Sequence, residues 1–351
     1  MSDICPNPTS LRKQIRIFRA DSMIHTPFDE TGPRPELLSA GIAFVDHPEK
    51  ADLIIVRRAR FLKDVGKYDK AFAIWTHEPR LSVHSQPIVR IAGVRNAVYV
   101  MNALTGNIYT DEFFGFSSAE IDFDTAMACF ATKPRRAVML ASYRRPLRSS
   151  ERAAADLTLY RQGLALHLQR LDFCDIYGRH WPDDVKVLGN SRVGNWRAAK
   201  AEILKGYAVN LAFENNIVPQ YITEKIWDAV INACLPVYHG AQNGVYRVFP
   251  EGSFIEAAGK SVEELGDEIL AMSQPEMAER YEACLRAYLK ICRKNRRKIS
   301  RHACALRTIE FLRNAVAAHE SKGRSPAAIW TRLAARLRAK ARRDDDVRRR
   351  L

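Results

Sequence analysis

The chain lacks the patterns by which several classes of protein are recognised. Its seven cysteines form no Cys-x-x-Cys pair, its nine histidines form no His-x-x-x-His or His-Glu-x-x-His set, and there is no repeat of fixed period. These absences argue against a zinc site, a disulfide framework and a solenoid, and favour buried thiols. No apolar run approaches the roughly 18 residues of a membrane helix. The opening residues, MSDICPNPTSLRKQIR, have no apolar core of a signal peptide.

The chain does contain enough apolar sequence for two folded domains. It has 351 residues, of which 47% are hydrophobic, and short apolar runs alternate with helical stretches in both halves, as in α/β proteins. The expected strands of the first half are residues 14–18, 53–57, 72–76, 88–91 and 97–101. A strand at 137–143 opens the second half. We therefore expect an N-terminal α/β domain over residues 1–132 and a C-terminal α/β domain over residues 133–323.

The net charge of +15 is concentrated at the C-terminus, where residues 324–351 contain ten Lys or Arg and three Asp. Trp330, Leu333 and Leu337 share one face of a possible helix with arginines around them. Such a helix could bind an anionic membrane surface through residues 326–351, and the alternative is a solvated or disordered tail. A basic pI also suits nucleic-acid binding, but no zinc finger, RNP-like or helix-turn-helix pattern accompanies it. We expect no specific nucleic-acid partner.

The segment from Tyr207 to Ile255 has the order of a phosphate-binding unit. A strand at 209–213 ends at Glu214 and Asn215, Thr223 can cap a following helix, and 235–238 is the next strand. The helix has one apolar face, made of Ile226, Ala229, Val230 and Ala233. A helix N-terminus attracts anions, and Lys225 adds a positive charge in the first turn, where it is otherwise unfavourable. The alternative is an ordinary βαβ unit with Lys225 in solvent.

The identities of the residues in this segment carry more information than its pattern of strands and helix. FEN, YITEK, LPVYHGA and FPEGSFI, in this order, closely resemble the donor-binding signature of the α-1,3/1,4-fucosyltransferases, which move fucose from GDP-fucose onto N-acetylglucosamine or glucose of a glycan. The resemblance implies that Glu224 binds the ribose hydroxyls and Lys225 the phosphates. It also places Tyr221 near the nucleotide and Glu214 and Asn215 at the same site. Alternatively, Tyr221 packs on the helix, and Glu214 and Asn215 close the loop by hydrogen bonds.

The resemblance implies a second phosphate ligand upstream. Family spacing from the DIYGR sequence, residues 175–179, places this arginine at Arg161, with Arg144, Arg145 and Arg152 as nearby competitors. Arginine suits bidentate contact to a pyrophosphate. Because Lys225, Arg161 and the helix dipole can neutralise the diphosphate, we expect GDP-fucose as donor substrate, no metal site and no obligatory cofactor.

A third block, AFAIWTHEPRLS at residues 71–82, resembles the family's Trp-rich strand followed by a Glu-x-Pro turn. An inverting transfer needs a base that takes the proton of the acceptor hydroxyl as the diphosphate leaves from the opposite face. Glu78 is the candidate general base. His77 is the alternative, because an unperturbed pKa of about 6.5 suits this role.

The family has the GT-B fold, so the resemblance implies two Rossmann-like domains facing a cleft, with the acceptor domain first. It implies inverting transfer of L-fucose to a glycan hydroxyl, O3 of N-acetylglucosamine or glucose, in lipopolysaccharide or another surface polysaccharide. The lack of an N-terminal anchor indicates a bacterial, cytoplasmic form, peripheral on the inner membrane through its tail. Another nucleotide sugar is the alternative donor. The sequence does not identify the acceptor. The segment VYVMNALTGNIYTDEFFGF lacks the family's NWT and YR-x-DS motifs, and Met101-Asn102 and residues 109–111 hold the equivalent places.

Overall fold

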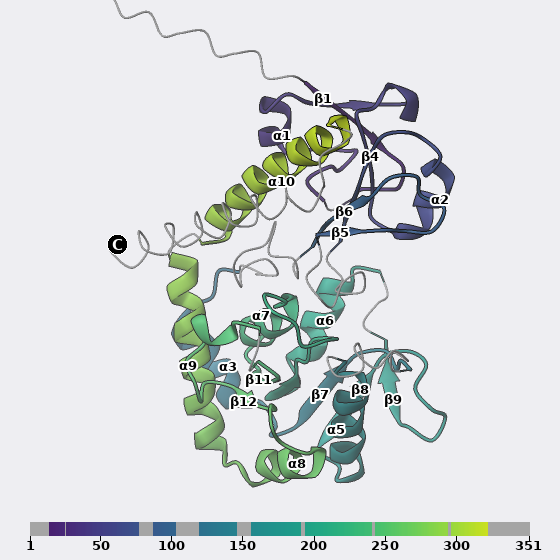
Figure 1. The fold of residues 1–351 in the computed structure, drawn as a ribbon. Coiled ribbons are helices and arrows are strands. Elements are labelled where there is room, and N and C mark those ends of the chain that lie inside the picture. The colour runs from purple at the N-terminus through teal and green to yellow at the C-terminus, as the bar shows by residue number, and fades with distance from the viewer. Residues whose placement is uncertain are drawn as a thin grey trace, which may run out of the picture. The chain divides into compact units, whose positions relative to one another are not determined.

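The computed structural model describes residues 14–24, 26–76, 87–102, 119–145, 156–190, 194–240, 243–293 and 296–321. The chain divides into two compact units (Figure 1). The N-terminal unit contains the described residues up to 102 together with those from His302 onward. The C-terminal unit contains the described residues from 119 to 301.

The N-terminal unit is built on a six-stranded sheet of order β2-β1-β3-β4-β6-β5. All pairs are parallel except β5 with β6. The strands are β1 (Ile15–Arg19), β2 (Ile42–Val45), β3 (Leu53–Val56), β4 (Ala71–Trp75), β5 (Ile88–Val89) and β6 (Val98–Met101). Its helical segments are α1 (Pro35–Ser39), η1 (Pro48–Lys50), η2 (Ala59–Phe61), α2 (Leu62–Val65) and α10 (Arg296–Glu320). Every residue of β3, β4 and β6 is buried, as expected for parallel strands covered on both faces.

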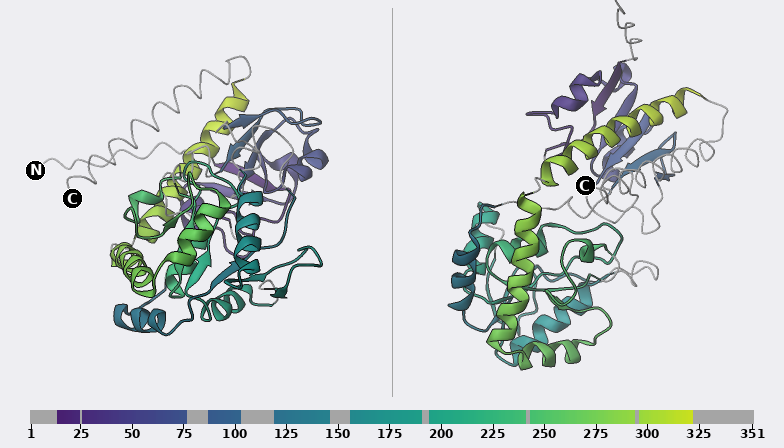
Figure 2. Two further views of the ribbon diagram at one scale, coloured as in Figure 1. Left: turned by 90° about the horizontal axis from the view of Figure 1, so that it is seen from below. Right: turned by 90° about the vertical axis from the view of Figure 1, so that its left-hand side faces the viewer.

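Helix α10 covers one face of this sheet from His302 onward (Figures 1 and 2). The ring of Phe311 meets that of Tyr99 edge-on at 6.1 Å between centroids. Leu312 and Ala315 are fully buried in the same cluster, and Arg313 donates to the carbonyl of Ala40 at 2.8 Å. The expected C-terminal domain of residues 133–323 therefore differs from the observed unit, because the apolar face of α10 is used to cover the N-terminal sheet.

The C-terminal unit has a fully parallel six-stranded sheet of order β12-β11-β10-β7-β8-β9. Its strands are β7 (Ala137–Leu140), β8 (Cys174–Tyr177), β9 (Val187–Gly189), β10 (Val209–Leu211), β11 (Leu235–Tyr238) and β12 (Ile255–Glu256). Its helical segments are α3 (Phe123–Ala131), α5 (Thr158–Arg170), α6 (Trp196–Leu204), α7 (Glu224–Ile231), η3 (Val245–Arg247), α8 (Val262–Ala271) and α9 (Gln274–Arg293). Helix α3 packs here, although the expected boundary at 132 placed it in the first domain. The expectation of two Rossmann-like α/β domains in one chain is confirmed.

Strands β7 and β10 lie side by side at the point where the chain reverses its direction across the C-terminal sheet. The chain leaves β7 toward β8 on one side and leaves β10 toward β11 on the other. Ligands of open α/β sheets bind beyond the carboxyl ends of the strands at such a point. Here the two connections are joined, because the Leu157 N–H donates to the Asn215 carbonyl at 3.1 Å and Asp156 pairs with Asn216 in an isolated bridge.

Some expected features lie outside the described residues. These are His77 and Glu78, Arg152, residues 109–111 and the basic tail over 324–351. The six cysteines that are described are free thiols, and Cys174, Cys234, Cys284 and Cys304 among them are buried. Among the described residues, no helix combines the length and the apolar composition that crossing a membrane requires.

Gly178, which follows β8 in the DIYGR sequence, is predicted to tolerate no side chain. Its φ is +151°, and a Cβ would lie 2.1 Å from the Ala141 carbonyl oxygen and 2.9 Å from the Ser142 nitrogen. Because both are backbone atoms, we expect Gly178→Ala to lower the free energy of unfolding by about 2 kcal/mol or more in urea titration. The control is Gly206→Ala, whose Cβ would meet no atom nearer than 3.6 Å. A stability of Gly178→Ala equal to that of this control would contradict the prediction.

Candidate functional site

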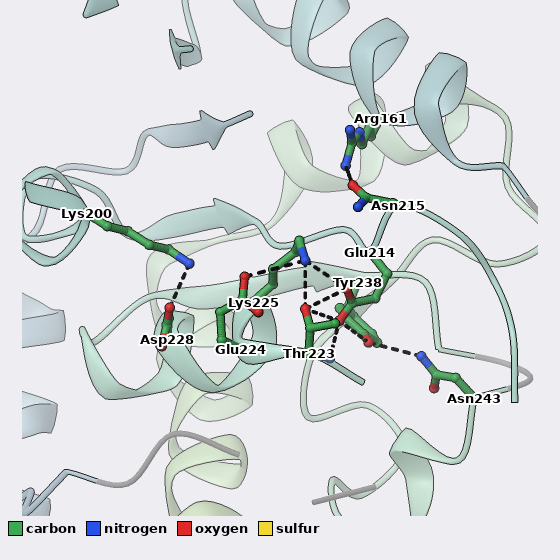
Figure 3. Close-up of polar contacts among 10 residues, drawn as sticks. All are labelled: Arg161, Lys200, Glu214, Asn215, Thr223, Glu224, Lys225, Asp228, Tyr238 and Asn243. Atoms are coloured by element: carbon green, nitrogen blue, oxygen red, sulfur yellow. Dashed lines mark hydrogen bonds and ion pairs between the residues drawn. The ribbon is translucent and has the colours of Figure 1, made fainter. Parts of the chain in front are cut away.

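The buried carboxylate of Glu214 is the centre of a polar network beyond the end of β10 (Figure 3). Its side chain is 1% exposed. It accepts hydrogen bonds from the Thr223 N–H at 2.6 Å, from the Tyr238 hydroxyl at 3.2 Å and from the Lys225 ammonium at 3.0 Å. These bonds tie the end of β10 to the first turn of α7 and to the end of β11. Glu214 therefore closes the loop, as the structural alternative expected, but it does so by holding a lysine.

Thr223 occupies the N-cap position of α7, as the sequence predicted. Its hydroxyl, however, bonds no N–H of the described first turn. Instead, it lies 2.9 and 2.7 Å from the two Glu214 oxygens and accepts from Lys225 at 2.7 Å. The first N–H groups of α7 are thus left without a side-chain cap, which suits a helix end that binds an anion.

Lys225 is not the solvated lysine of the alternative interpretation. Its side chain is 23% exposed, and its ammonium lies 3.0 Å from Glu214 and 3.6 Å from Glu224. Burial alone would lower the pKa of Lys225, but the charges of Glu214 and Glu224 outweigh it and raise the pKa. The lysine is therefore held as a cation in the first turn of α7.

Glu224 presents its carboxylate at the same helix end, with 40% of its side chain exposed. Burial opposes its ionisation, but the charges of Lys225 and Lys200 outweigh this effect and lower the pKa of Glu224 to about 2. Lys200 reaches across from α6 and forms an ion pair with Asp228 of α7 at 2.8 Å. Glu224 is consequently ionised at neutral pH and accessible as an acceptor for hydroxyl groups.

Arg161 and Asn215 meet across the point between β7 and β10. Arg161 lies in the first turn of α5, only 3% exposed, and its guanidinium donates to the Asn215 side-chain oxygen at 2.8 Å. The Nε of Arg161 is buried and has no hydrogen-bond partner among the described residues. Burial and the charge of Arg144 lower the pKa of Arg161 to about 10, so it remains charged at neutral pH. A buried guanidinium with an unused donor is suited to an anionic ligand.

The competitors of Arg161 are less suited to this role in the described structure. Arg145 is exposed, and Arg144 is half-buried, with its backbone N–H donating to Gln162 at 2.8 Å. Tyr221 is 2% exposed and lies within electrostatic range of Arg161. Tyr221 is therefore buried in the segment before α7, and both its packing on the helix and its contact with a nucleotide remain predictions.

Two residues of the network were missed by the sequence analysis. The Tyr238 hydroxyl accepts from the Asn243 side chain at 3.0 Å, and the Asn243 oxygen accepts from the Val245 N–H at 3.1 Å. Burial and the charge of Glu214 raise the pKa of Tyr238 well above its ordinary value, so it stays a neutral donor. The sequence contained one signal of the role of Tyr238, which is a hydroxyl-bearing residue at the end of the otherwise apolar strand β11.

The sequence also contains an Asp-x-Asp spacing at Asp122 and Asp124, which some sugar transferases use to bind a metal. Asp122 is the N-cap of α3, and its carboxylate accepts from the Thr125 N–H at 2.8 Å. Among the described residues, no group of three or more His, Cys, Asp or Glu side chains is arranged to hold a metal ion.

The Glu214–Lys225 ion pair is predicted to be the main contribution of this network to stability. Glu214→Gln removes the charge that compensates the partly buried Lys225 ammonium, so we expect a loss of about 3 kcal/mol in the free energy of unfolding. Tyr238→Phe removes one hydrogen bond to the same carboxylate and should cost about 1 kcal/mol. Denaturant titration of both variants measures the difference. Equal losses would mean that the ion pair is not the dominant interaction.

Comparison with known proteins locates this site within a described domain family. Residues 155–314 match the family model "Glycosyltransferase family 10 (fucosyltransferase) C-term". The match includes Arg161, Glu214, Asn215, Tyr221 and the Glu224–Lys225 pair, and excludes Glu78.

Two curated relatives match a shorter part of the chain. The 3-galactosyl-N-acetylglucosaminide 4-alpha-L-fucosyltransferase FUT3 of Homo sapiens is 35% identical over 99 residues, which are 27% of this chain and 23% of that protein. The 4-galactosyl-N-acetylglucosaminide 3-alpha-L-fucosyltransferase FUT6 of Gorilla gorilla gorilla is 35% identical over 98 residues, with the same shares. The chain thus matches about a quarter of the length of these relatives.

Solved structures are similar at lower identity. An alpha1,3-fucosyltransferase with GDP-fucose is 16% identical with a TM-score of 0.44, over 80% of this chain and 85% of that chain. AviGT4, a glycosyltransferase involved in avilamycin A biosynthesis, is 11% identical with a TM-score of 0.34, over 87% of this chain and 98% of that chain.

Proposed function

We propose that this chain, whose residues 155–314 match the model of glycosyltransferase family 10, the fucosyltransferases, is a member of that family and transfers fucose from GDP-fucose to a hydroxyl of a glycan. The observation that carries the proposal is the arrangement beyond β7 and β10. Two cations, Lys225 and Arg161, are held by Glu214 and Asn215, and an ionised carboxylate, Glu224, lies beside one of them. A nucleoside diphosphate has the matching chemistry, because its phosphates are anionic and its ribose hydroxyls are donors.

In the proposed donor complex, Lys225 and Arg161 bind the diphosphate. They stabilise the charge that develops as the bond from fucose to the phosphate breaks, so this role needs no metal ion. Glu224 accepts hydrogen bonds from the two ribose hydroxyls. Asn215 is fixed by Arg161 at the same edge, and Tyr221 supports the loop beside the nucleotide. Glu214 binds no ligand in this proposal and positions Lys225 instead.

The acceptor half of the reaction is proposed for the N-terminal unit. Glu78 follows β4 by three residues in the sequence, and β4 is a buried strand of a sheet whose neighbours are parallel to it. We assign it as the general base of an inverting transfer to O3 of N-acetylglucosamine or glucose, with His77 as the alternative base. The acceptor glycan is assigned to lipopolysaccharide or another surface polysaccharide of a bacterium. In that setting residues 326–351 would hold a cytoplasmic enzyme peripherally on the anionic inner membrane.

The donor assignment predicts selective stabilisation by one nucleotide sugar. We expect GDP-fucose to raise the melting temperature of the protein more than GDP-mannose or UDP-glucose does. Lys225→Ala should weaken GDP binding at least about tenfold in calorimetry, because a charge-assisted hydrogen bond to phosphate is lost. Lys205→Ala is the matched control, because Lys205 is an exposed lysine at the C-terminal end of α6 that pairs with Glu202. Unchanged affinity in Lys225→Ala would remove this site from the proposal.

The general-base assignment predicts a loss of turnover without a loss of donor binding. Glu78→Gln should lower kcat by about 10² or more, the usual effect of removing a general base, while GDP affinity stays unchanged. A parallel His77→Asn variant serves as the comparison. Normal turnover in Glu78→Gln together with a large loss in His77→Asn would move the role to His77.

A further inference from the structure

Trp196 is an exposed aromatic side chain at the edge of the C-terminal sheet where the proposed donor site lies. It is the first residue of α6 and is 43% exposed, whereas Trp75, Trp181 and Trp227 are at most 8% exposed. Asn195 caps the helix through a bond from the Ala198 N–H at 3.4 Å. Exposure of an indole has no benefit for folding, because a buried tryptophan contributes far more apolar contact. Folding alone therefore does not explain the exposure of the Trp196 indole.

The topology places Trp196 beside the first turn of α7. Helix α6 connects β9 to β10, and α7 connects β10 to β11, so both begin at the carboxyl edge of the sheet. Both connections cross the sheet in the same direction, and right-handed crossovers therefore put the two helices on one face. The ion pair between Lys200 and Asp228 at 2.8 Å joins them.

The spacing along each helix then brings Trp196 near Glu224. Trp196 precedes Lys200 by four residues, and Glu224 precedes Asp228 by four residues. Residues four apart lie on one helix face, one turn above the other. Trp196 and Glu224 thus lie one turn closer to the carboxyl edge than the ion pair does. The charge of Lys200 is also one of the causes that lower the pKa of Glu224.

The order of groups along the edge matches the parts of a nucleotide. Figure 3 shows Lys200 and its partner Asp228 on the side of Glu224 opposite to Arg161, with Lys225 in the middle. In a nucleotide the phosphates and the base leave the ribose at opposite ends. If Glu224 binds the ribose and the two cations bind the phosphates, the base extends toward α6.

We infer that Trp196 is the platform on which the purine base of the nucleotide stacks. The inference rests on the proposed function, because it takes the ribose to be bound at Glu224. The guanidinium of Arg197 lies 5.3 Å from the centroid of the indole ring, a distance at which a cation is attracted to an aromatic ring. Stacking on an aromatic ring suits a planar base and adds affinity without any contact to the phosphates. Trp196 is therefore a binding residue for the base and takes no part in the transfer step.

The test compares ligands with and without the base. Calorimetry with GDP and with inorganic pyrophosphate is carried out on wild type, Trp196→Ala, Trp196→Phe and Leu171→Ala. Leu171 is an exposed leucine after α5, at 50% exposure, and serves as the surface control. We expect Trp196→Ala to weaken GDP binding about fivefold to a hundredfold, as loss of a base stack does, and to leave pyrophosphate binding within about twofold. Trp196→Phe should retain most of the GDP affinity.

The outcomes separate this inference from the proposed function. GDP affinity within about twofold of wild type in Trp196→Ala would overturn the stacking role while the donor site stands. An equal loss of GDP and pyrophosphate would also overturn it, because the change would then act on the phosphate site through α6. A wild-type protein that binds neither GDP nor pyrophosphate would refute the proposed function itself. A GDP-induced quench of tryptophan fluorescence that is present in wild type and absent in Trp196→Phe would support the stack independently.

Discussion

A negative charge buried beneath a helix end determines the geometry of the donor site. The Glu214 carboxylate is removed from water, and a charge in such a place is tolerated only when it is paired and fully hydrogen-bonded. Its partners come from three segments: the residues before α7, the first turn of α7 and the end of β11. Because Lys225 is one of them, a side chain that would otherwise extend into solvent is held at the helix N-terminus. Placement of the cation and closure of the loop are therefore a single interaction.

The same principle operates on the other side of the junction between β7 and β10. Arg161 is buried at a cost in solvation, seen in its lowered pKa, and Asn215 satisfies part of its hydrogen-bonding capacity. The FEN sequence thus has two structural duties in adjacent residues. Glu214 holds the cation of α7, and Asn215 holds the cation of α5. Both cations are held by partners within the protein, and such fixed positions are the condition for strong electrostatic stabilisation of a leaving group.

The local sequence predicted many of the strands and helices. It did not predict the contacts between segments that are far apart in the chain. The strands with long apolar runs and helix α7 follow from local sequence patterns, whereas the choice of Arg161 came from the spacing of the family that the sequence resembles. Strands β2, β9 and β12 were missed. All three are edge strands; β9 and β12 have only three and two residues, and the apolar run of β2 is only four residues long. The bonds of Tyr238 and Asn243 to the Glu214 network depend on tertiary contacts that no spacing encodes. The packing of α10 on the N-terminal sheet was missed for the same reason, because the sequence of an apolar helix face does not show which surface it packs against.

The return of α10 to the first sheet imposes an order on folding during synthesis. The sheet face that bears Ile17, Ala73 and Tyr99 is covered by residues that emerge from the ribosome only after the whole C-terminal unit. At ordinary elongation rates this interval is on the order of tens of seconds. The C-terminal unit, a contiguous stretch of chain, can be complete while the N-terminal sheet still exposes an apolar face. A nascent chain of this protein therefore exposes this apolar sheet face until α10 is made.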